Sequence, residues 1–407
     1  MLAEFFRIPD EISYLNMKPF YQSRIESIDF VRGLVMLIMA LDHTRELFHT
    51  TSLSQSPTDL ATTTPLLFFT RWITHLCAPT FVFLSGVSAY LSYTKKENFI
   101  SSRKFLIKRG LWLIFLEITF INFGVWFDWH FQILMLQVIF AIGCGFIILG
   151  LMLQCPPKVF LIAGLTIIAF HNIYPMLPLP AESTSKQILD ALFTVQFQPI
   201  SSHTNLLLIY PPIPWTGIMF SGFGIAPFLL TTIRKRKSIY IISAQIGIIL
   251  FLVLRFNNGY GDPTPWSDQN NMVYTVMAFV NLNKYPPSLM YTLLMLGLMF
   301  IILFLAEGKR GRYMQWITVY GKVPLFYYVL HWYVLHILLF ILIFSERFSY
   351  SQLVFGFNLG RPEAFKGVPL AGVYLIWILV VALFYPICKW FSRYKASNMD
   401  KKWLRYL

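Results

Sequence analysis

Long apolar runs, separated by short polar or charged segments, repeat along most of the chain. Runs of about 20 apolar residues are long enough for an α-helix to cross a bilayer, and only a helix or a closed barrel satisfies the backbone there. The pattern predicts an all-α, polytopic membrane helix bundle of about ten transmembrane helices. Its ten clearest spans are 29–49, 66–93, 104–127, 131–152, 157–176, 205–231, 238–255, 285–306, 317–343 and 370–391.

These spans predict one transmembrane domain, 29–391, between an N-terminal segment, 1–28, and a basic C-terminal tail, 392–407. Segment 1–28 has no apolar core of the signal-peptide kind, so we expect no cleaved leader. Charged residues make up 13% of the chain, about half the share in soluble domains, which argues against a soluble protein of this size.

Lysine and arginine are distributed unevenly between the two sides of this predicted bundle. With a cytoplasmic N-terminus, the inner segments hold 25 of the 33 lysines and arginines and the outer segments hold 5. The other three, Arg45, Arg71 and Arg255, lie within spans. Cytoplasmic loops normally carry this excess, so we expect both termini in the cytoplasm. The net charge of +14 is then a topology signal and does not indicate nucleic-acid binding.

Two irregular segments fall on the predicted outer side. Segment 271–283 is apolar but too short to span, and it precedes a turn, 284–288, in which Pro286 and Pro287 cannot continue a helix. Three prolines likewise interrupt the start of span 205–231. Irregular backbone at membrane depth needs protein or water to satisfy it, so we expect both breaks to wall a cavity.

Polar groups also gather on this side, where all eight histidines are expected. Counted at 1.5 Å per residue, Asp42 lies ~10 Å deep, Arg71 ~8 Å and His75 ~14 Å. Asp42, Arg45 and His49 share one helix face by their spacing, and Arg71 and His75 share another. Intramembrane charges are usually paired and functional, so we expect Asp42 to pair with Arg45 or Arg71.

A histidine beside a carboxylate is typical of a general base with its orienting acid, which makes His43 and His49 the candidate bases. The alternatives stay open. The Asp42–Arg71 pair can be purely structural, and His49 can be an interfacial residue. His75 and His331 can each be hydrogen-bonded core residues. The four cysteines show neither CxxC spacing nor a ligand pattern, so no disulfide framework and no metal site are predicted.

Basic residues cluster on the predicted inner side, and they can hold a nucleotide phosphate or an anionic lipid. Topology alone already explains them. The clusters are Lys95, Lys96, Arg103, Lys104, Lys108 and Arg109, and the run Arg234–Lys237.

Four segments resemble the heparan-alpha-glucosaminide N-acetyltransferase-like catalytic domain family, in its bacterial branch. Ser27–Gly33, running into Met39–His43, is similar to its opening signature, and Phe69–His75 with Ala78-Pro79 to its second helix. The segments Lys284–Ser288 and Gly321–His331 match further blocks, so the resemblance covers about residues 23–391.

The resemblance implies a transmembrane acyltransferase in the bacterial inner (plasma) membrane. It implies an acyl-CoA co-substrate, acetyl-CoA or another, with no tightly bound cofactor, and a sugar or glycan acceptor on the far side; the expected partners also include the lipid bilayer and a homodimer. A histidine near the outer end of the first helix is expected to be catalytic, matching His43 or His49. The chain departs from the lysosomal enzymes, which carry asparagine at Asp42 and have their histidine further downstream.

On this basis His43 or His49, oriented by Asp42, would deprotonate an acceptor that attacks the thioester, or would itself carry the acyl group. Arg71, Arg45 or Lys284 would stabilise the oxyanion. The remaining candidates are substrate-binding His75, Trp215, Tyr285, Ser288 and His331, and CoA-binding Lys104, Lys108 and Arg109.

A transporter or flippase for a polar or anionic solute is the alternative, because broken helices and buried charges are typical of such proteins. No inverted repeat is visible in the sequence, and the polar groups sit on one side, which argues against it. A purely structural scaffold leaves the clustered histidines unexplained.

Overall fold

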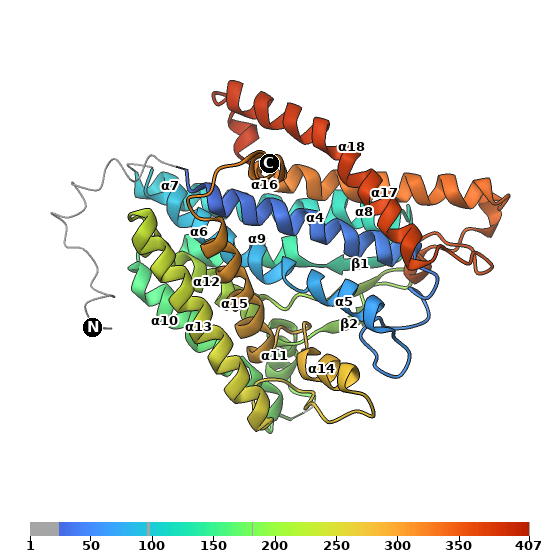
Figure 1. The fold of residues 1–407 in the computed structure, drawn as a ribbon, viewed down its shortest axis with the longest axis horizontal. Coiled ribbons are helices and arrows are strands. Elements are labelled where there is room, and N and C mark those ends of the chain that lie inside the picture. Colours follow the sequence, from blue (N-terminus) through green and yellow to red (C-terminus); the bar gives the residue numbers. More distant parts are fainter. Residues whose placement is uncertain (1–23, 96–97, 181, 407) are drawn as a thin grey trace.

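The computed structural model describes residues 24–95, 98–180 and 182–406 (Figure 1). Residues 1–23 of the predicted N-terminal segment, and Lys96 of the predicted basic cluster, lie outside the described residues. The described chain is mostly helical, as predicted. Six helical segments are long and apolar enough to cross a membrane among the residues searched: 65–93, 157–176, 233–257, 289–306, 324–345 and 370–397.

The helices follow the predicted spans closely, although several spans are divided. The helices of the first half are α4 (Glu26–Phe48), α5 (Pro65–Thr74), α6 (Cys77–Tyr93), α7 (Phe99–Leu116), η1 (Glu117–Ile121), α8 (Asn122–Trp126), α9 (Val138–Leu151), α10 (Pro157–Phe170), η2 (His171–Met176) and α11 (Thr184–Phe193). Those of the second half are α12 (Pro212–Leu229), α13 (Ile233–Asn257), α14 (Met272–Val280), α15 (Leu289–Ala306), α16 (Arg312–Lys322), α17 (Pro324–Ser345) and α18 (Leu370–Ser397), with 3₁₀ turns Tyr350–Gln352, Gly356–Asn358 and Lys402–Arg405.

Proline and helix geometry explain the divisions. Predicted span 317–343 is two helices, α16 and α17, because Pro324 removes a backbone donor at the junction. Predicted span 104–127 contains the π-helical turn η1, which carries the buried Glu117. The short apolar segment 271–283 forms α14, which ends just before the predicted turn.

The all-α prediction is wrong where two spans begin. Predicted spans 131–152 and 205–231 start with strands β1 (Ile133–Leu136) and β3 (Asn205–Leu208). These strands pair in parallel, and β2 (Gln196–Pro199) pairs with β3 in antiparallel orientation. On its other edge β1 is bonded by a helix side chain, since Nδ2 of Asn122 donates to the Met135 carbonyl at 2.8 Å. A four-residue apolar run looks the same in a buried strand and a buried helix, so periodicity could not separate them.

Helix α4 runs through the centre of the bundle and carries the first resembling segment (Figure 1). Its backbone touches that of α16: a Cβ on Gly33 would lie 2.1 Å from the Ile317 carbonyl oxygen, and one on Gly321 would lie 1.8 Å from the Asp29 carbonyl oxygen. Only glycine allows this approach. The contact fixes the depth of α4, and therefore the position of the polar residues near its end.

Candidate active site

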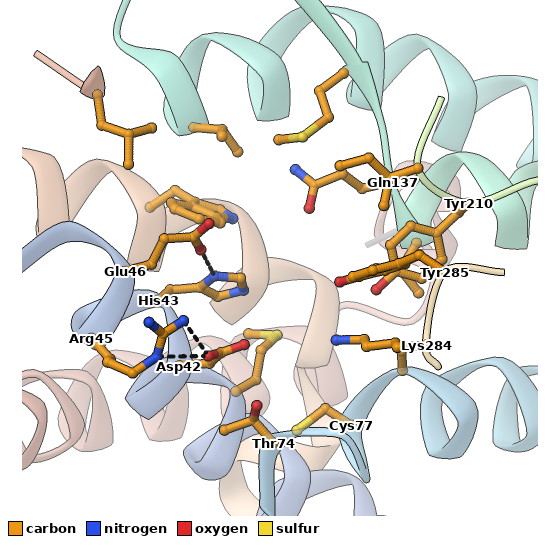
Figure 2. A pocket seen from close by; sticks show the side chains of 18 of the residues that line it. Asp42, His43, Arg45, Glu46, Thr74, Cys77, Gln137, Tyr210, Lys284 and Tyr285 are labelled. Carbon is orange, nitrogen blue, oxygen red and sulfur yellow. Dashed lines mark hydrogen bonds and ion pairs between the residues drawn. The ribbon is translucent and has the colours of Figure 1, made fainter. Parts of the chain in front are cut away.

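A cavity of about 570 Å³ lies where the end of α4 faces the turn at Lys284 and Tyr285 (Figure 2). We call it the main cavity. A second, more polar cavity of about 670 Å³ adjoins it, because both are lined by Arg45, Arg71 and Lys284. We call this second cavity the polar vestibule. Its walls include Ser, Thr, Asn and Gln side chains from the segment after α4 and the segment after α14.

His43 projects from α4 into the main cavity, with 14% of its side chain exposed. Its Nδ1 lies 3.3 Å from Oε2 of Glu46 (Figure 2). An ionised carboxylate can only accept, so Nδ1 is the donor in this pair and Nε2 is the ring nitrogen left for a ligand. The imidazole also packs against Trp332, with ring centroids 4.1 Å apart. A histidine held in this way by a carboxylate is typical of a general base with its orienting acid.

Asp42 forms the predicted ion pairs, but it is not the acid that orients His43. Its Oδ1 accepts from Nη2 of Arg45 at 3.1 Å, and its Oδ2 pairs with Nη1 of Arg71. Both guanidiniums therefore hold the carboxylate, whereas the carboxylate in contact with His43 is that of Glu46. The reason is helical geometry: adjacent residues point about 100° apart, whereas Glu46 stands three residues after His43 and shares its face.

His49, the second predicted base, makes its contacts with the backbone at the end of α4. It caps α4 and forms a β-bridge with Val368, and its Nδ1 accepts from the Thr51 backbone N–H at 3.3 Å. Of the two histidines, His43 is the one among the residues lining the main cavity.

Lys284 and Tyr285 form the wall opposite His43, and Figure 2 shows both pointing into the main cavity. The Lys284 ammonium lies 5.0 Å from the Tyr285 ring centroid, and that ring packs edge-on against Tyr210. Arg71 lines the same cavity beside them. This wall therefore offers two cations and a phenol hydroxyl to any anion that forms in the cavity.

Three predicted contact residues lie behind the cavity walls, which corrects their expected role. Trp215 is fully buried behind Tyr210, with ring centroids 4.6 Å apart. His331 is fully buried behind His43 at 5.3 Å, and its Nδ1 donates to the Tyr328 carbonyl. Ser288 caps α15 and donates from Oγ to Oδ2 of Asp262 at 2.6 Å. Trp215 and His331 therefore each lie behind a side chain that lines the cavity, Tyr210 and His43 respectively.

His75 lies on the other side of the site, where it lines the polar vestibule. Its carbonyl accepts from the Tyr291 hydroxyl at 2.7 Å, which ties the junction of α5 and α6 to α15. Its Nδ1 is buried and has no hydrogen-bond partner among the described residues. A ligand in the vestibule could supply one.

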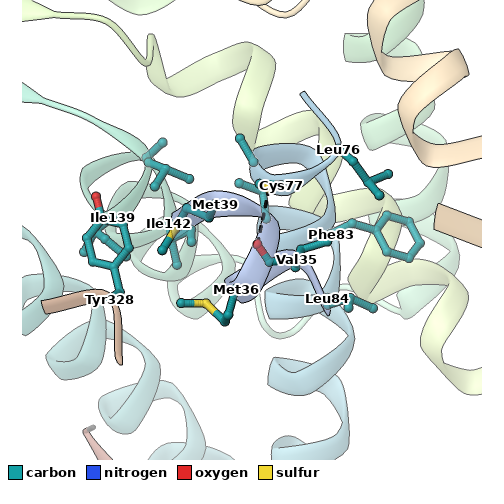
Figure 3. Close-up of a cluster of buried hydrophobic side chains, with 14 of the residues drawn as sticks. Val35, Met36, Met39, Leu76, Cys77, Phe83, Leu84, Ile139, Ile142 and Tyr328 are labelled. Carbon is teal, nitrogen blue, oxygen red and sulfur yellow. Dashed lines mark hydrogen bonds between the residues drawn. The ribbon is translucent and has the colours of Figure 1, made fainter. Parts of the chain in front are cut away.

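Arg109 is the one of the three predicted CoA-binding residues that reaches a cavity wall. A narrow apolar cavity of about 90 Å³, the apolar neck, runs from Arg109 past Met36 and Ile142. It shares Phe81, Val138 and Tyr328 with the main cavity, and Figure 3 shows the buried side chains around it. Lys104 and Lys108 are exposed on α7 and are not among the residues that line this neck.

Several lining residues were missed by the sequence interpretation. Glu46 carried a usable signal, since its spacing from His43 places both on one helix face. Gln137 carried no such signal in the sequence. It lines the main cavity because it directly follows strand β1, which was not predicted. Its backbone N–H donates to Oε1 of the buried Glu117 at 2.8 Å.

Arg255, an intramembrane cation in the sequence, holds the connection that carries the Lys284 wall. It is buried, and it donates to the carbonyls of Thr264, Ala278 and Phe279 at 2.8–2.9 Å. It therefore satisfies the C-terminal carbonyls of α14 with a positive charge, as a helix C-terminus favours.

Replacing Arg255 with methionine should loosen this connection, because buried carbonyls would lose a charged donor. Hydrogen bonds to charged groups contribute about 1.5–3 kcal/mol, so amide exchange over residues 258–288 should accelerate by roughly tenfold or more. Hydrogen–deuterium exchange measures this directly. The matched control is Arg234→Met, exposed at the start of the same helix, which should leave exchange there unchanged. Equal exchange in both variants would contradict this role.

More than half of the chain is similar to a known protein family. A family model described as heparan-alpha-glucosaminide N-acetyltransferase, catalytic, matches residues 24–254, which is more than half of the 407-residue chain. The match includes His43, Glu46 and the polar residues of α5. It ends before the Lys284 turn and α17. No curated protein matches the chain significantly.

Proposed function

The chain belongs to the heparan-alpha-glucosaminide N-acetyltransferase catalytic domain family, and from this premise we propose that it is an acyl-CoA-dependent acyltransferase of the bacterial plasma membrane. The family implies a membrane transferase of the acetyltransferase type. The finer proposal is transfer of an acyl group, acetyl in the first instance, to an amine or hydroxyl of an envelope sugar or similar acceptor. The observation that carries it is the His43–Glu46 pair facing Lys284 and Tyr285 across one cavity.

His43 is the proposed base. Its Nε2 takes the proton from the acceptor hydroxyl or amine, whose oxygen or nitrogen then attacks the thioester carbonyl carbon. The developing oxyanion faces Lys284 and Tyr285, with Arg71 beside them. Collapse of this intermediate breaks the C–S bond, and the proton on Nε2 passes to the departing CoA thiolate. In this scheme the acyl group passes directly to the acceptor; an acyl-histidine intermediate would use the same side chains in two steps.

The donor is proposed to reach His43 along the apolar neck. Its lining is mostly apolar, as an acyl-pantetheine arm requires, and Arg109 stands at its far end. That guanidinium would hold a CoA phosphate, with Lys104 and Lys108 on the same helix nearer its exposed end. The neck is narrow, so Phe81 and Tyr328 must shift to admit the arm.

The acceptor is proposed to enter from the opposite side through the polar vestibule. Its hydroxyl and amide side chains suit a sugar. We propose the topology predicted from the charges, with ten spans and both termini cytoplasmic, so that the vestibule faces outward. The transporter alternative keeps one supporting observation, the polar cavity next to broken helices.

Purified full-length protein in nanodiscs tests the proposal. With acetyl-CoA and a panel of amino- and hydroxyl-bearing sugars, we expect acceptor-dependent release of free thiol, matched by acetylated sugar in mass spectra. No thioester consumption with any acceptor, in protein that still unfolds cooperatively, would contradict it. Solute flux into proteoliposomes without any thioester would favour the transporter instead.

A further inference from the structure

A hollow of about 1,120 Å³ opens at the other end of the bundle, between the start of α4, α16 and α18. It lies far from the chemistry, since Asp29 on its wall is fourteen residues before His43, or ~21 Å along α4. We call it the basic hollow. Six cationic side chains line it, in addition to Arg24: Lys309, Arg310, Arg312, Lys322, Lys389 and Arg393.

Two carboxylates, those of Glu26 and Asp29, also line the hollow. Asp29 pairs with Arg24, and none of the six cations forms an ion pair with any carboxylate among the described residues. Like charges gathered around one hollow repel each other and produce a strong positive potential, which an anion would relieve. The positive-inside bias explains why cations are at this end of the bundle. It does not explain why they surround a hollow of this volume.

Helix α18 forms one wall of the hollow and also carries exposed apolar side chains, which suit a lipid-facing surface. Trp316 stacks on Tyr385, with ring centroids 5.6 Å apart, and the Lys389 ammonium lies 5.4 Å from the Tyr385 ring centroid. Along α18, Leu383 is 47% exposed and lies ten residues before Arg393, or ~15 Å, about half the thickness of the hydrocarbon core. Acyl chains packed along α18 would therefore bring a headgroup to the level of Arg393.

We propose that the basic hollow binds the phosphate of an anionic membrane lipid whose acyl chains lie along the exposed face of α18. A lipid headgroup and a soluble phosphate compound would both be recognised through their phosphate. The apolar face of α18 favours the lipid. The site is separate from the proposed donor route: it shares no described lining residue with the main cavity or the apolar neck. Between them, the α4 and α16 backbones touch at Gly33 and Gly321. The proposal therefore does not depend on acyltransferase activity.

Native mass spectrometry of the full-length protein, released from nanodiscs of mixed anionic and zwitterionic phospholipids, tests the proposal. The double variant Lys389→Ala/Arg393→Ala should lower the affinity for anionic lipid by about fivefold per removed cation, hence roughly 25-fold. A second pair on the opposite wall, Lys309→Ala/Arg312→Ala, should do the same. The control Arg234→Ala/Lys235→Ala removes equal charge from exposed positions outside the hollow, and should retain the lipid.

Two outcomes would overturn the proposal. One is equal lipid retention, or an equal loss, in the hollow variants and the control, because the effect would then be one of total charge. The other comes from inorganic pyrophosphate added in purely zwitterionic nanodiscs. If pyrophosphate binds the hollow tightly and anionic lipid does not displace it, the ligand is a soluble phosphate compound and the lipid assignment is wrong.

Discussion

Replacing His43 with glutamine should lower the rate of acyl transfer by about 10²–10⁴-fold, the usual contribution of a positioned general base. Glutamine keeps a polar side chain of similar reach but cannot take the proton. Donor affinity should change little, because the proposed donor contacts lie along the apolar neck. Acceptor-dependent thiol release gives the rate, and isothermal titration with a non-hydrolysable thioester analogue gives the affinity.

Two further variants distinguish the contribution of His43 from those of His49 and Glu46. His49→Gln should retain most activity, because His49 is held by backbone contacts at the end of α4. Glu46→Gln should cause a smaller loss than His43→Gln, because the imidazole loses the carboxylate that holds it but keeps its basic nitrogen. Full activity in His43→Gln together with inactivity in His49→Gln would reverse the assignment.

Replacing Asp42 with leucine should destabilise the protein by about 3–5 kcal/mol, as expected when one partner of a buried ion-pair network is removed. Arg45 and Arg71 would remain as two adjacent guanidiniums without their shared carboxylate. Thermal or denaturant unfolding in a mild detergent gives the change in stability. The control is Asp190→Leu. Its partly exposed pair with Lys186 should contribute about 1 kcal/mol at most, and its hydrogen bond from the Tyr174 hydroxyl about 1 kcal/mol more.

A second substitution checks the reason for this loss. If unpaired charge is the cause, adding Arg71→Leu to Asp42→Leu should restore part of the stability, because one buried guanidinium is removed. Independent, additive losses in the double variant would contradict that explanation. They would mean that packing at Asp42 matters more than its charge.

The sequence predicted the helices and the Asp42 pairing well, because both follow from distance along a helix. Apolar run lengths set the spans, and a rise of 1.5 Å per residue placed Asp42 and Arg71 at matching depths. The strands β1 and β3 were missed because four apolar residues carry no distinguishing period. Their pairing depends on side chains far away in the sequence, such as Asn122.

The sequence predicted less well the direction in which each side chain points around its helix axis. Depth alone placed His331 and Trp215 beside the cavity, but both point into the layer behind it. The orienting carboxylate was assigned to Asp42 because that residue adjoins His43 in the sequence. Glu46 has that role because one helical turn, not one residue, brings side chains together.

The apolar neck bears on the proton gradient across the membrane. In the proposed scheme the two substrates arrive from opposite sides of the membrane. Such an enzyme must not become a pore between turnovers, since a water-filled passage would dissipate the proton gradient. The apolar side chains of Phe81 and Val138 and the ring of Tyr328, which line the neck, disfavour water and hydrated ions. The thioester arm that opens it would also plug it. The same few side chains would then close the passage between turnovers and pack around the bound thioester arm during catalysis.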